Sequence, residues 1–282
     1  MFRENRTVRT FKRCSRQELN EAGIDGGAFP LKTFLLLFLL SPSWLYAGWE
    51  VIQRRDSEAP KRAATASELT MRNGTSEAEV QLVYFTPADI KLEVVTNPDG
   101  KIKGVQDAVD SHGSFGGING GYFEPNLDPV GLLISNNRVV HPVRKAKLLS
   151  GIFFVRNGRP ELTRTSEFPG TKGVQQAIQC GPFLVDGGRT VDGLDDLRVA
   201  PRTFIFTCGP AVWGFGICRS VTLKEMGDML ARANVIPENH IVRALNFDGG
   251  SSTALYLRLD DRSIFSEGRS AVSNYLIVQL KH

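Results

Sequence analysis

Apolar and polar residues alternate in many short runs from Val80 to the end of the 282-residue chain. Alternation with a period of two is typical of β-strands that bury one face. The strands predicted in this way cover residues 80–85, 90–96, 116–123, a pair within 130–140, 152–155, 160–163, 174–179, 183–185, 203–208, 212–218, 242–247, 254–257 and 275–280. Asn157-Gly158 lies between two of these runs and is a strong signal for a hairpin turn.

Helical spacing of apolar residues is clearest after residue 220. Thr222 and Glu225 have the spacing of a capping box, in which each side chain bonds the backbone N–H of the other residue. The apolar face that follows consists of Leu223, Met226, Met229, Leu230 and Ala233. A shorter helix is predicted over 105–112. Together the elements predict an α+β (mixed α/β) fold: one strand-rich domain of catalytic type with one well-defined amphipathic helix near 222–233.

The first 47 residues have a different pattern. Seven basic and four acidic side chains surround an apolar run over 31–40, which is followed by a proline and by Ala47. This order is typical of a secretory signal with cleavage after Ala47, and the run is short for a membrane span, which needs about 20 residues. Leu45 is not the small residue preferred before a cut, so residues 1–47 are interpreted as a signal peptide or a signal anchor. Both predict export to the periplasm or the extracellular space, with membrane contact only through this segment.

Residues 48–79 are rich in Arg, Glu, Ala, Ser and Thr and have no sustained apolar period. We interpret them as a linker. Asn73-Gly-Thr75 within this segment fits a glycosylation acceptor. The remaining residues, 80–282, are then predicted to form a single domain.

The formal net charge is +4, from 34 basic and 30 acidic side chains, and most of the excess falls within residues 1–47. The rest is close to neutral, which argues against a nucleic-acid partner. The sequence has no Walker loop, no G-x-G-x-x-G, no G-x-S-x-G and no H-x-x-x-H, so nucleotide, serine-hydrolase and zinc sites have no support. No cofactor and no metal site are predicted. EF-hand spacing is absent from the sequence, but acidic oxygens and loop carbonyls leave a divalent cation such as calcium open as an alternative.

Glycines and polar residues interrupt the predicted strands at 116–124, 179–188 and 246–253. Functional groups often lie where strands end. In the third segment Asp248 comes before two glycines and three hydroxyl residues, and a carboxylate beside a loop that offers N–H groups to an anion suits phosphate or sugar chemistry. In the first, a ligand contact by Asn119 competes with a bulge or tight turn in which Asn119 caps its own backbone.

Four short motifs, taken in order, match the pattern of one known family. Asn119-Gly-Gly-Tyr-Phe123 is similar to N-[AG]-G-[FY]-F, and Ala200-Pro-Arg-Thr203 to an A-R-T segment with a proline inserted. Asn246-Phe-Asp-Gly-Gly-Ser-Ser252 is similar to N-L-D-G-G-G-S with a serine in place of the third glycine, and Arg269-Ser-Ala-Val-Ser-Asn274 to a closing R-x-V-x-N. These motifs resemble those of the phosphodiester glycosidase family, and the similarity covers residues 116–280.

The resemblance implies a reaction and its catalytic residues. The family cleaves the bond between a sugar's anomeric carbon and a phosphodiester oxygen, which releases the sugar and a phosphomonoester through an oxocarbenium-like transition state. Asp248 is then expected to be the general base or nucleophile. Asn119 is expected to hold a sugar hydroxyl or the attacking water. Glu124 is expected to be the partner acid, with Glu267 as a weaker candidate.

The resemblance also implies a phosphate site. Arg202 is expected to clamp the phosphate with two parallel hydrogen bonds, and Arg269 is a second candidate for that role. Two glycine-rich loops are expected to complete the site with Gly120, Gly121, Gly249, Gly250, Ser251 and Ser252. The structural alternatives are that Arg202 pairs with Asp248 as a buried ion pair and that Asp248 caps its own turn.

The predicted function is therefore a secreted or periplasmic hydrolase that acts on a sugar-1-phosphodiester in a glycan or envelope polymer. The competing interpretations are an exported protein that binds a glycan or phosphate polymer without cleaving it, and a different hydrolase on the same fold. Convergence of Asn119, Arg202 and Asp248 in one cleft would favour the enzyme, because a catalytic site needs convergence.

Three cysteines follow the N-terminal segment: Cys180, Cys208 and Cys218. If the strands that carry Cys208 and Cys218 form a hairpin, its register places Cys218 opposite Arg202. A Cys208–Cys218 bridge is then disfavoured by distance, whereas a bridge from Cys180 to either one stays open.

Overall fold

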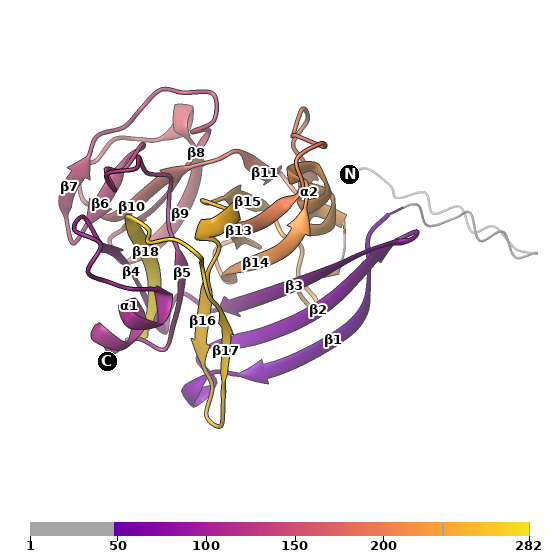
Figure 1. Ribbon diagram of the computed structural model, residues 1–282. Coiled ribbons are helices and arrows are strands. Elements are labelled where there is room, and N and C mark those ends of the chain that lie inside the picture. The colour runs from indigo at the N-terminus through magenta and orange to yellow at the C-terminus, as the bar shows by residue number, and fades with distance from the viewer. Residues whose placement is uncertain (1–47, 233, 282) are drawn as a thin grey trace, which may run out of the picture. The chain divides into compact units, whose positions relative to one another are not determined.

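The computed structural model describes residues 48–232 and 234–281, and their strands form three antiparallel sheets (Figure 1). The first sheet has eight strands in the order β1 (Glu50–Glu58), β2 (Thr65–Asn73), β3 (Ser76–Phe85), β14 (Trp213–Val221), β13 (Ala200–Thr207), β15 (Arg243–Asn246), β11 (Phe183–Asp186) and β12 (Arg189–Thr190). The second has the order β7 (Arg138–His141), β6 (Leu133–Ser135), β10 (Val174–Cys180), β8 (Gly151–Arg156) and β9 (Arg159–Arg164). The third has the order β17 (Ser263–Ser266), β16 (Leu255–Arg258), β5 (Gly116–Asn119), β18 (Asn274–Leu280) and β4 (Ile90–Thr96).

Two α-helices and three short 3₁₀ turns complete the elements of these residues: α1 (Val105–Ser111), α2 (Leu223–Arg232), η1 (Pro60–Arg62), η2 (Thr165–Glu167) and η3 (Gly250–Ser252). Met226 of α2 packs in one apolar cluster with Phe204 and Phe206 of β13. Ile205 alternates to the other face of this strand and joins a second cluster, which also contains Phe153 from the second sheet and Leu276 from the third. The large sheet is therefore buried on both faces around β13, by α2 on one side and by the other two sheets on the other.

The local signals for the helix and the hairpin are confirmed. The backbone N–H of Glu225 donates to Thr222 Oγ1 over 3.1 Å, and that of Thr222 donates to Glu225 Oε2 over 2.8 Å, so the capping box begins α2. Ala233, the last residue of the predicted apolar face, lies outside the described residues. Asn157 and Gly158 both have positive φ in the turn that joins β8 and β9, as a two-residue hairpin turn requires.

The strand-rich α+β prediction is confirmed at the level of fold class. Every ladder between the described strands is antiparallel. A mixed α/β fold connects parallel strands through helices, so this arrangement favours α+β. With two α-helices in the described residues, the helical share is minor.

The linker predicted over 48–79 is wrong. Strands β1 and β2 lie within it, and they pair with each other and with β3 at one end of the eight-stranded sheet (Figure 1). Strand β1 is an edge strand with mostly exposed residues, so it has no apolar period to detect. Gly74 and Thr75 form the turn of the β2–β3 hairpin, with Gly74 at a φ of 61°. Asn73-Gly-Thr75, interpreted from the sequence as a glycosylation acceptor, thus lies at a hairpin turn.

Residues 1–47, interpreted as a signal peptide or signal anchor, lie outside the described residues, and that interpretation stays a prediction. Within 48–232 and 234–281, no helix is long and apolar enough to cross a membrane.

The predicted cysteine register is confirmed. Cys218 pairs with Arg202 across β13 and β14, and Cys180, Cys208 and Cys218 are all free thiols. The bridge left open between Cys180 and either partner is therefore not formed. Burial raises the pKa of Cys208 to about 11 and that of Cys218 to about 12, so both thiols stay protonated near neutral pH.

Candidate functional site

Two glycine-rich segments that are far apart in the sequence meet at the ends of β5 and β15. The Asn119 side-chain amide donates to the backbone carbonyl of Asp248 over 2.7 Å, and the Asp248 N–H donates to the Gly120 carbonyl over 3.0 Å. Thr203 of β13 joins them, because its Oγ1 donates to Asn119 Oδ1 over 2.8 Å. The motifs around Asn119, Arg202 and Asp248 therefore converge, as the family resemblance implies.

Asn119 does not have the role that the resemblance implies. Its side chain is fully buried, and its Oδ1 also accepts from the backbone N–H of Ala254 over 3.0 Å. A buried amide with these partners does not reach a sugar hydroxyl or an attacking water. Asn119 is instead a positioning residue, which holds the backbone of Asp248 in place.

Gly120 and Gly121 are needed for close packing rather than for phosphate binding. Both are buried, and a Cβ at Gly120 would overlap the Asn274 side-chain amide. The N–H of Gly121 donates to Asn274 Oδ1 over 2.9 Å, so it is not free for an anion. The predicted phosphate contact of these two residues is therefore wrong, because β18 occupies the space in front of them.

Asp248 is half-buried at the start of the second loop. Its Oδ1 accepts from the Gly249 N–H over 3.0 Å, and its carboxylate also accepts a hydrogen bond from the Ser252 side chain. Asp248 thus caps its own turn, as the structural alternative predicted. Burial raises its pKa, against the opposing effect of these hydrogen bonds. A raised pKa makes the carboxylate a better proton acceptor, so the turn cap and a chemical role are compatible.

Arg202 does not clamp a phosphate. Its Nε donates to the Val221 carbonyl over 3.2 Å and its Nη2 to the Arg198 carbonyl over 2.5 Å. The Nε–Nη2 edge of the guanidinium thus bonds two backbone carbonyls, and Arg202 does not line the groove beside Asp248. Arg202 is 8% exposed, and burial lowers its pKa. The buried ion pair with Asp248, the other alternative, is absent among the described residues.

A groove of about 440 Å³ opens beside the Asp248 loop. Gly250, Ser251 and Arg269 line it, all of them predicted site residues, together with Glu267. Asp248 does not line the groove itself and lies two residues before Gly250 on its wall. The backbone N–H of Arg269 donates to the Ser251 carbonyl over 2.7 Å and joins the two walls. Gly250 has a φ of 63°, which glycine adopts without strain, and it begins the turn η3 that shapes this wall.

Glu124, the predicted partner acid, lies elsewhere. It is exposed at the start of a turn in which its N–H donates to the Asp128 carbonyl over 2.8 Å. It does not line the groove, and within the described residues it forms no ion pair. Glu267, the weaker candidate from the sequence, lines the groove. Its position therefore favours Glu267 over Glu124 as the second acid of the site.

Arg219 is a groove residue that the sequence did not indicate. It follows Cys218 on β14, at a point where the register between β13 and β14 shifts by a bulge opposite Pro201. A bulge redirects side chains, and proline within a strand is typical of bulges. Pro201, inserted in the family's A-R-T segment, was therefore the one signal that could have led to Arg219.

The groove is charged, and its charges are free. Arg219, Arg269 and Glu267 are exposed, and none of them forms an ion pair with another residue of 48–232 and 234–281. Two guanidinium groups and a carboxylate in one groove suit a ligand that carries an anionic group beside a polar, neutral one.

A buried polar layer lies under the Asp248 loop. The Tyr122 hydroxyl donates to the Gly181 carbonyl over 2.6 Å and accepts from Asn246 Nδ2 over 3.0 Å. Burial raises the pKa of the Tyr122 phenol, and the nearby Asp248 carboxylate raises it further. Tyr122 thus stays neutral and acts as a support for the loop.

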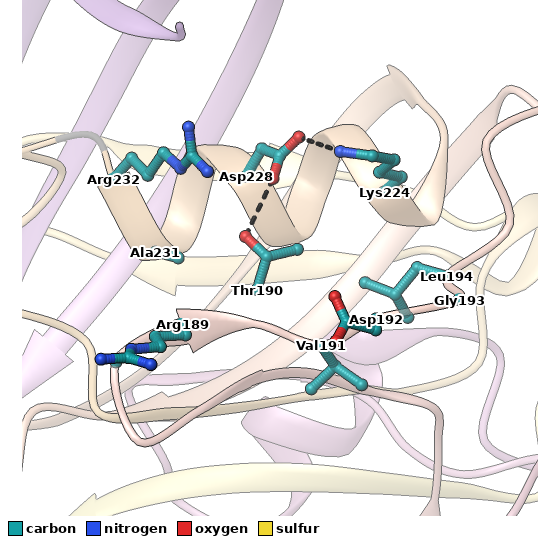
Figure 2. A pocket seen from close by; sticks show the side chains of 11 residues that line it. Arg189, Thr190, Val191, Asp192, Gly193, Leu194, Lys224, Asp228, Ala231 and Arg232 are labelled. Atoms are coloured by element: carbon teal, nitrogen blue, oxygen red, sulfur yellow. Dashed lines mark hydrogen bonds and ion pairs between the residues drawn. The ribbon is translucent and has the colours of Figure 1, made fainter.

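A second cavity, of about 470 Å³, lies between α2 and β12 (Figure 2). Its central carboxylate is already paired: Asp228 accepts from Thr190 Oγ1 over 2.9 Å and from Lys224 Nζ over 2.6 Å. None of the predicted site residues lines it. The groove beside Asp248 is therefore the candidate site.

Comparison with solved structures shows the same fold at low sequence identity. The catalytic domain of zebrafish N-acetylglucosamine-1-phosphodiester alpha-N-acetylglucosaminidase, auto-inhibited by its pro-peptide, matches with a TM-score of 0.58 and 13% identity over 81% of this chain and 88% of that one. A hypothetical protein from Synechocystis matches with a TM-score of 0.55 and 16% identity over 78% of this chain and 62% of that one. A protein of Burkholderia pseudomallei K96243 that is assigned to export matches with a TM-score of 0.51 and 11% identity over 73% and 74%.

No curated protein matches the sequence at a significant level. The model of the phosphodiester glycosidase family matches residues 112–279, well over half of the chain. That range contains the Asn119 and Asp248 loops and every residue that lines the groove. The chain therefore belongs to the phosphodiester glycosidase family.

Proposed function

We propose that this protein is an exported hydrolase that cleaves the bond between a sugar's anomeric carbon and a phosphodiester oxygen in a glycan or envelope polymer. Membership of the phosphodiester glycosidase family supports a glycosidase-type hydrolysis. Export is supported by the signal-like pattern of residues 1–47 and by the fold shared with a protein assigned to export.

The observation that carries the proposal is the groove beside Asp248. It places two unpaired arginines, Arg219 and Arg269, and the carboxylate of Glu267 next to a loop that begins with a second, half-buried carboxylate. Arginine binds phosphate oxygens with parallel, charge-assisted hydrogen bonds. A pair of carboxylates is the usual equipment for glycosidic hydrolysis.

The roles follow from the chemistry of the bond. Arg219 and Arg269 hold the phosphodiester, so the bond between the anomeric carbon and the phosphate oxygen breaks with its electron pair going to a stabilised phosphomonoester. Asp248 takes the proton of the water whose oxygen bonds to the anomeric carbon, and its raised pKa suits it to accept that proton. Glu267 faces the positive charge that develops on the sugar ring and stabilises it.

The test is hydrolysis of an activated α-GlcNAc phosphodiester by the wild type and by Asp248→Asn. Loss of an acid–base group costs about 10²–10⁴ in rate, so the variant should fall by at least a hundredfold. Asp260→Asn, in the exposed turn between β16 and β17, is the matched control and should keep full activity. A variant within tenfold of wild type would remove Asp248 from the chemistry. Saturable binding without release of sugar by the wild type would overturn the hydrolase itself.

A further inference from the structure

The strongest local charge of the described chain lies outside the groove. Between Asp128 and Glu161 the sequence contains no acidic residue and six basic ones. Four of these lie on one continuous segment, residues 138–148, which we name the basic strap: Arg138, Arg144, Lys145 and Lys147. Because the exported part of the chain is otherwise close to neutral, this concentration of charge is local and not a property of the whole surface.

The charges of the basic strap are available to a ligand. All four basic residues are exposed, and none of them forms an ion pair with an acidic side chain in the described part of the protein. Elsewhere basic residues are commonly paired, as in Arg72 with Glu77 and Arg262 with Glu68. Unpaired like charges on one segment repel each other, so an anionic ligand that lies along them would remove an unfavourable interaction.

The basic strap is held in a fixed position by one buried side chain. Gln179 is 2% exposed; its Oε1 accepts from the Arg144 N–H over 3.0 Å, and its Nε2 donates to the Arg144 carbonyl over 2.7 Å. The segment uses its backbone for these contacts and leaves its side chains outward. Gln179 is the last residue but one of β10, so these bonds attach the basic strap to a strand of the second sheet.

Buried residues next to Gln179 connect the basic strap to the candidate site. Just after Gln179, Gly181 lies so close to the backbone of Leu148 and Ser150 that a Cβ there would be 2.9 Å from the Ser150 nitrogen. The Gly181 carbonyl in turn accepts from Tyr122 and from Asn246, two residues before Asp248. The end of the basic strap and the Asp248 loop therefore contact the same buried layer.

We propose that the basic strap binds the neighbouring charged units of a polyanionic chain, so that the substrate is a polymer with repeated phosphate groups and not a single sugar phosphodiester. This proposal rests on the proposed function, because the polymer's scissile bond would lie in the groove. The four cations of the strap would add little affinity for a single phosphate, which Arg219 and Arg269 already bind in the proposed function. A polyanion instead releases condensed counterions into solution when the cations of the strap neutralise its phosphates, so its affinity depends on every cation of the strap.

Binding of the full-length protein to inorganic polyphosphate tests the proposal without catalysis, because this probe carries one negative charge per phosphate, as a phosphodiester polymer does. The strap variant combines Arg144→Gln, Lys145→Gln and Lys147→Gln. Its Kd should rise about tenfold or more, and the slope of log Kd against log salt should fall by about 2, as expected for three lost contacts. Asp248→Asn should bind as tightly as wild type, so the result is independent of hydrolysis.

A charge-matched control removes three exposed bases that form no described ion pair and lie outside the strap: Arg55→Gln, Lys61→Gln and Lys103→Gln. Its Kd should change less than twofold. Equal weakening by both variants, or no binding of polyphosphate by the wild type at low salt, would overturn the proposal. So would a strap variant that loses only its binding to vesicles of anionic lipid, because Val143 and Leu148 are exposed and a membrane surface would then be the ligand.

Discussion

The side-chain amide of Asn119 donates to the backbone carbonyl of Asp248 over 2.7 Å, and this contact joins two motifs of the family across β5 and β15. The Asp248 N–H returns a bond to Gly120 over 3.0 Å. The carboxylate of Asp248 is thus positioned from behind, by groups that need not touch a substrate. Positioning of this kind keeps a reactive group in its productive geometry without blocking the face that the ligand uses.

Replacement of Asn119 by alanine should therefore destabilise the fold as well as the site. The change removes the bond to Asp248 and leaves the Thr203 hydroxyl and the Ala254 N–H without their buried acceptor. We expect the free energy of unfolding in urea to fall by about 2–4 kcal/mol, because each buried unpaired group costs about 1–3 kcal/mol. Asn126→Ala, on an exposed turn, is the control and should change it by less than about 0.5 kcal/mol.

Gly120→Ala should be harmful for a steric reason. A Cβ at this position overlaps the Asn274 side chain, which also accepts from the Gly121 N–H. We expect a loss of about 1–3 kcal/mol and a clear drop in the melting temperature, as is usual for overpacking. Gly48→Ala is the matched control, because nothing lies within 4 Å of its added Cβ. Equal melting temperatures for the two variants would contradict the packing role of Gly120.

The raised pKa of Asp248 predicts a gain in stability when its charge is removed. Burial penalises the ionised form in the folded protein, so ionisation costs stability as the pH rises through the unfolded pKa and then the folded one. Below the unfolded pKa both states are protonated and the penalty vanishes. Asp248→Asn, which can still accept from Gly249, should therefore be more stable than wild type at pH 7 and close to wild type at low pH. Urea unfolding of both proteins across this pH range measures the difference.

Replacement of the groove residue Arg269 should weaken substrate binding, whereas replacement of the buried Arg202 should lower stability. Arg269→Gln, on the groove wall, should raise KM for a sugar phosphodiester about 10- to 100-fold, since a hydrogen bond to a charged group is worth about 1.5–3 kcal/mol, and should leave the melting temperature unchanged. Arg202→Gln loses bonds to the Val221 and Arg198 carbonyls and should lower the melting temperature instead. A large KM effect with full stability in the Arg202 variant would restore it as a phosphate ligand.

Chemical labelling of the three described cysteines tests whether they are free and buried. Cys180, Cys208 and Cys218 are free, and burial raises the pKa of the last two to about 11 and about 12. In a Cys14→Ser variant, whose cysteines are these three, the folded protein should thus react slowly with a maleimide at pH 8, because the thiolate is the reactive form. Labelling in denaturant without any reductant should reach all three. A mass two units below the reduced value would reveal a disulfide and contradict this description.

Local signals in the sequence were sufficient where a few neighbouring residues decide the structure. The Thr222–Glu225 capping box begins α2, Asn157-Gly158 forms a hairpin turn, and the alternation over 90–96 is the strand β4. The motifs around Asn119 and Asp248 also indicated the family and the place where its loops meet. Each of these features depends on backbone preference or on the period of apolar residues, which a single chain reveals.

Tertiary structure alone decided which of the motif residues face a ligand. Asn119, Gly120 and Arg202 belong to the predicted motifs, yet all three are buried, and the side chains of Asn119 and Arg202 bond groups inside the protein. Arg219 enters the groove through a bulge, and Glu267 replaces Glu124 there. The edge strand β1 could not be predicted from the sequence, because it is mostly exposed and lacks an apolar period. The absence of that period is also why residues 48–79 were interpreted as a linker. The direction of a side chain depends on contacts between strands far apart in the sequence, and these exist only in the folded chain.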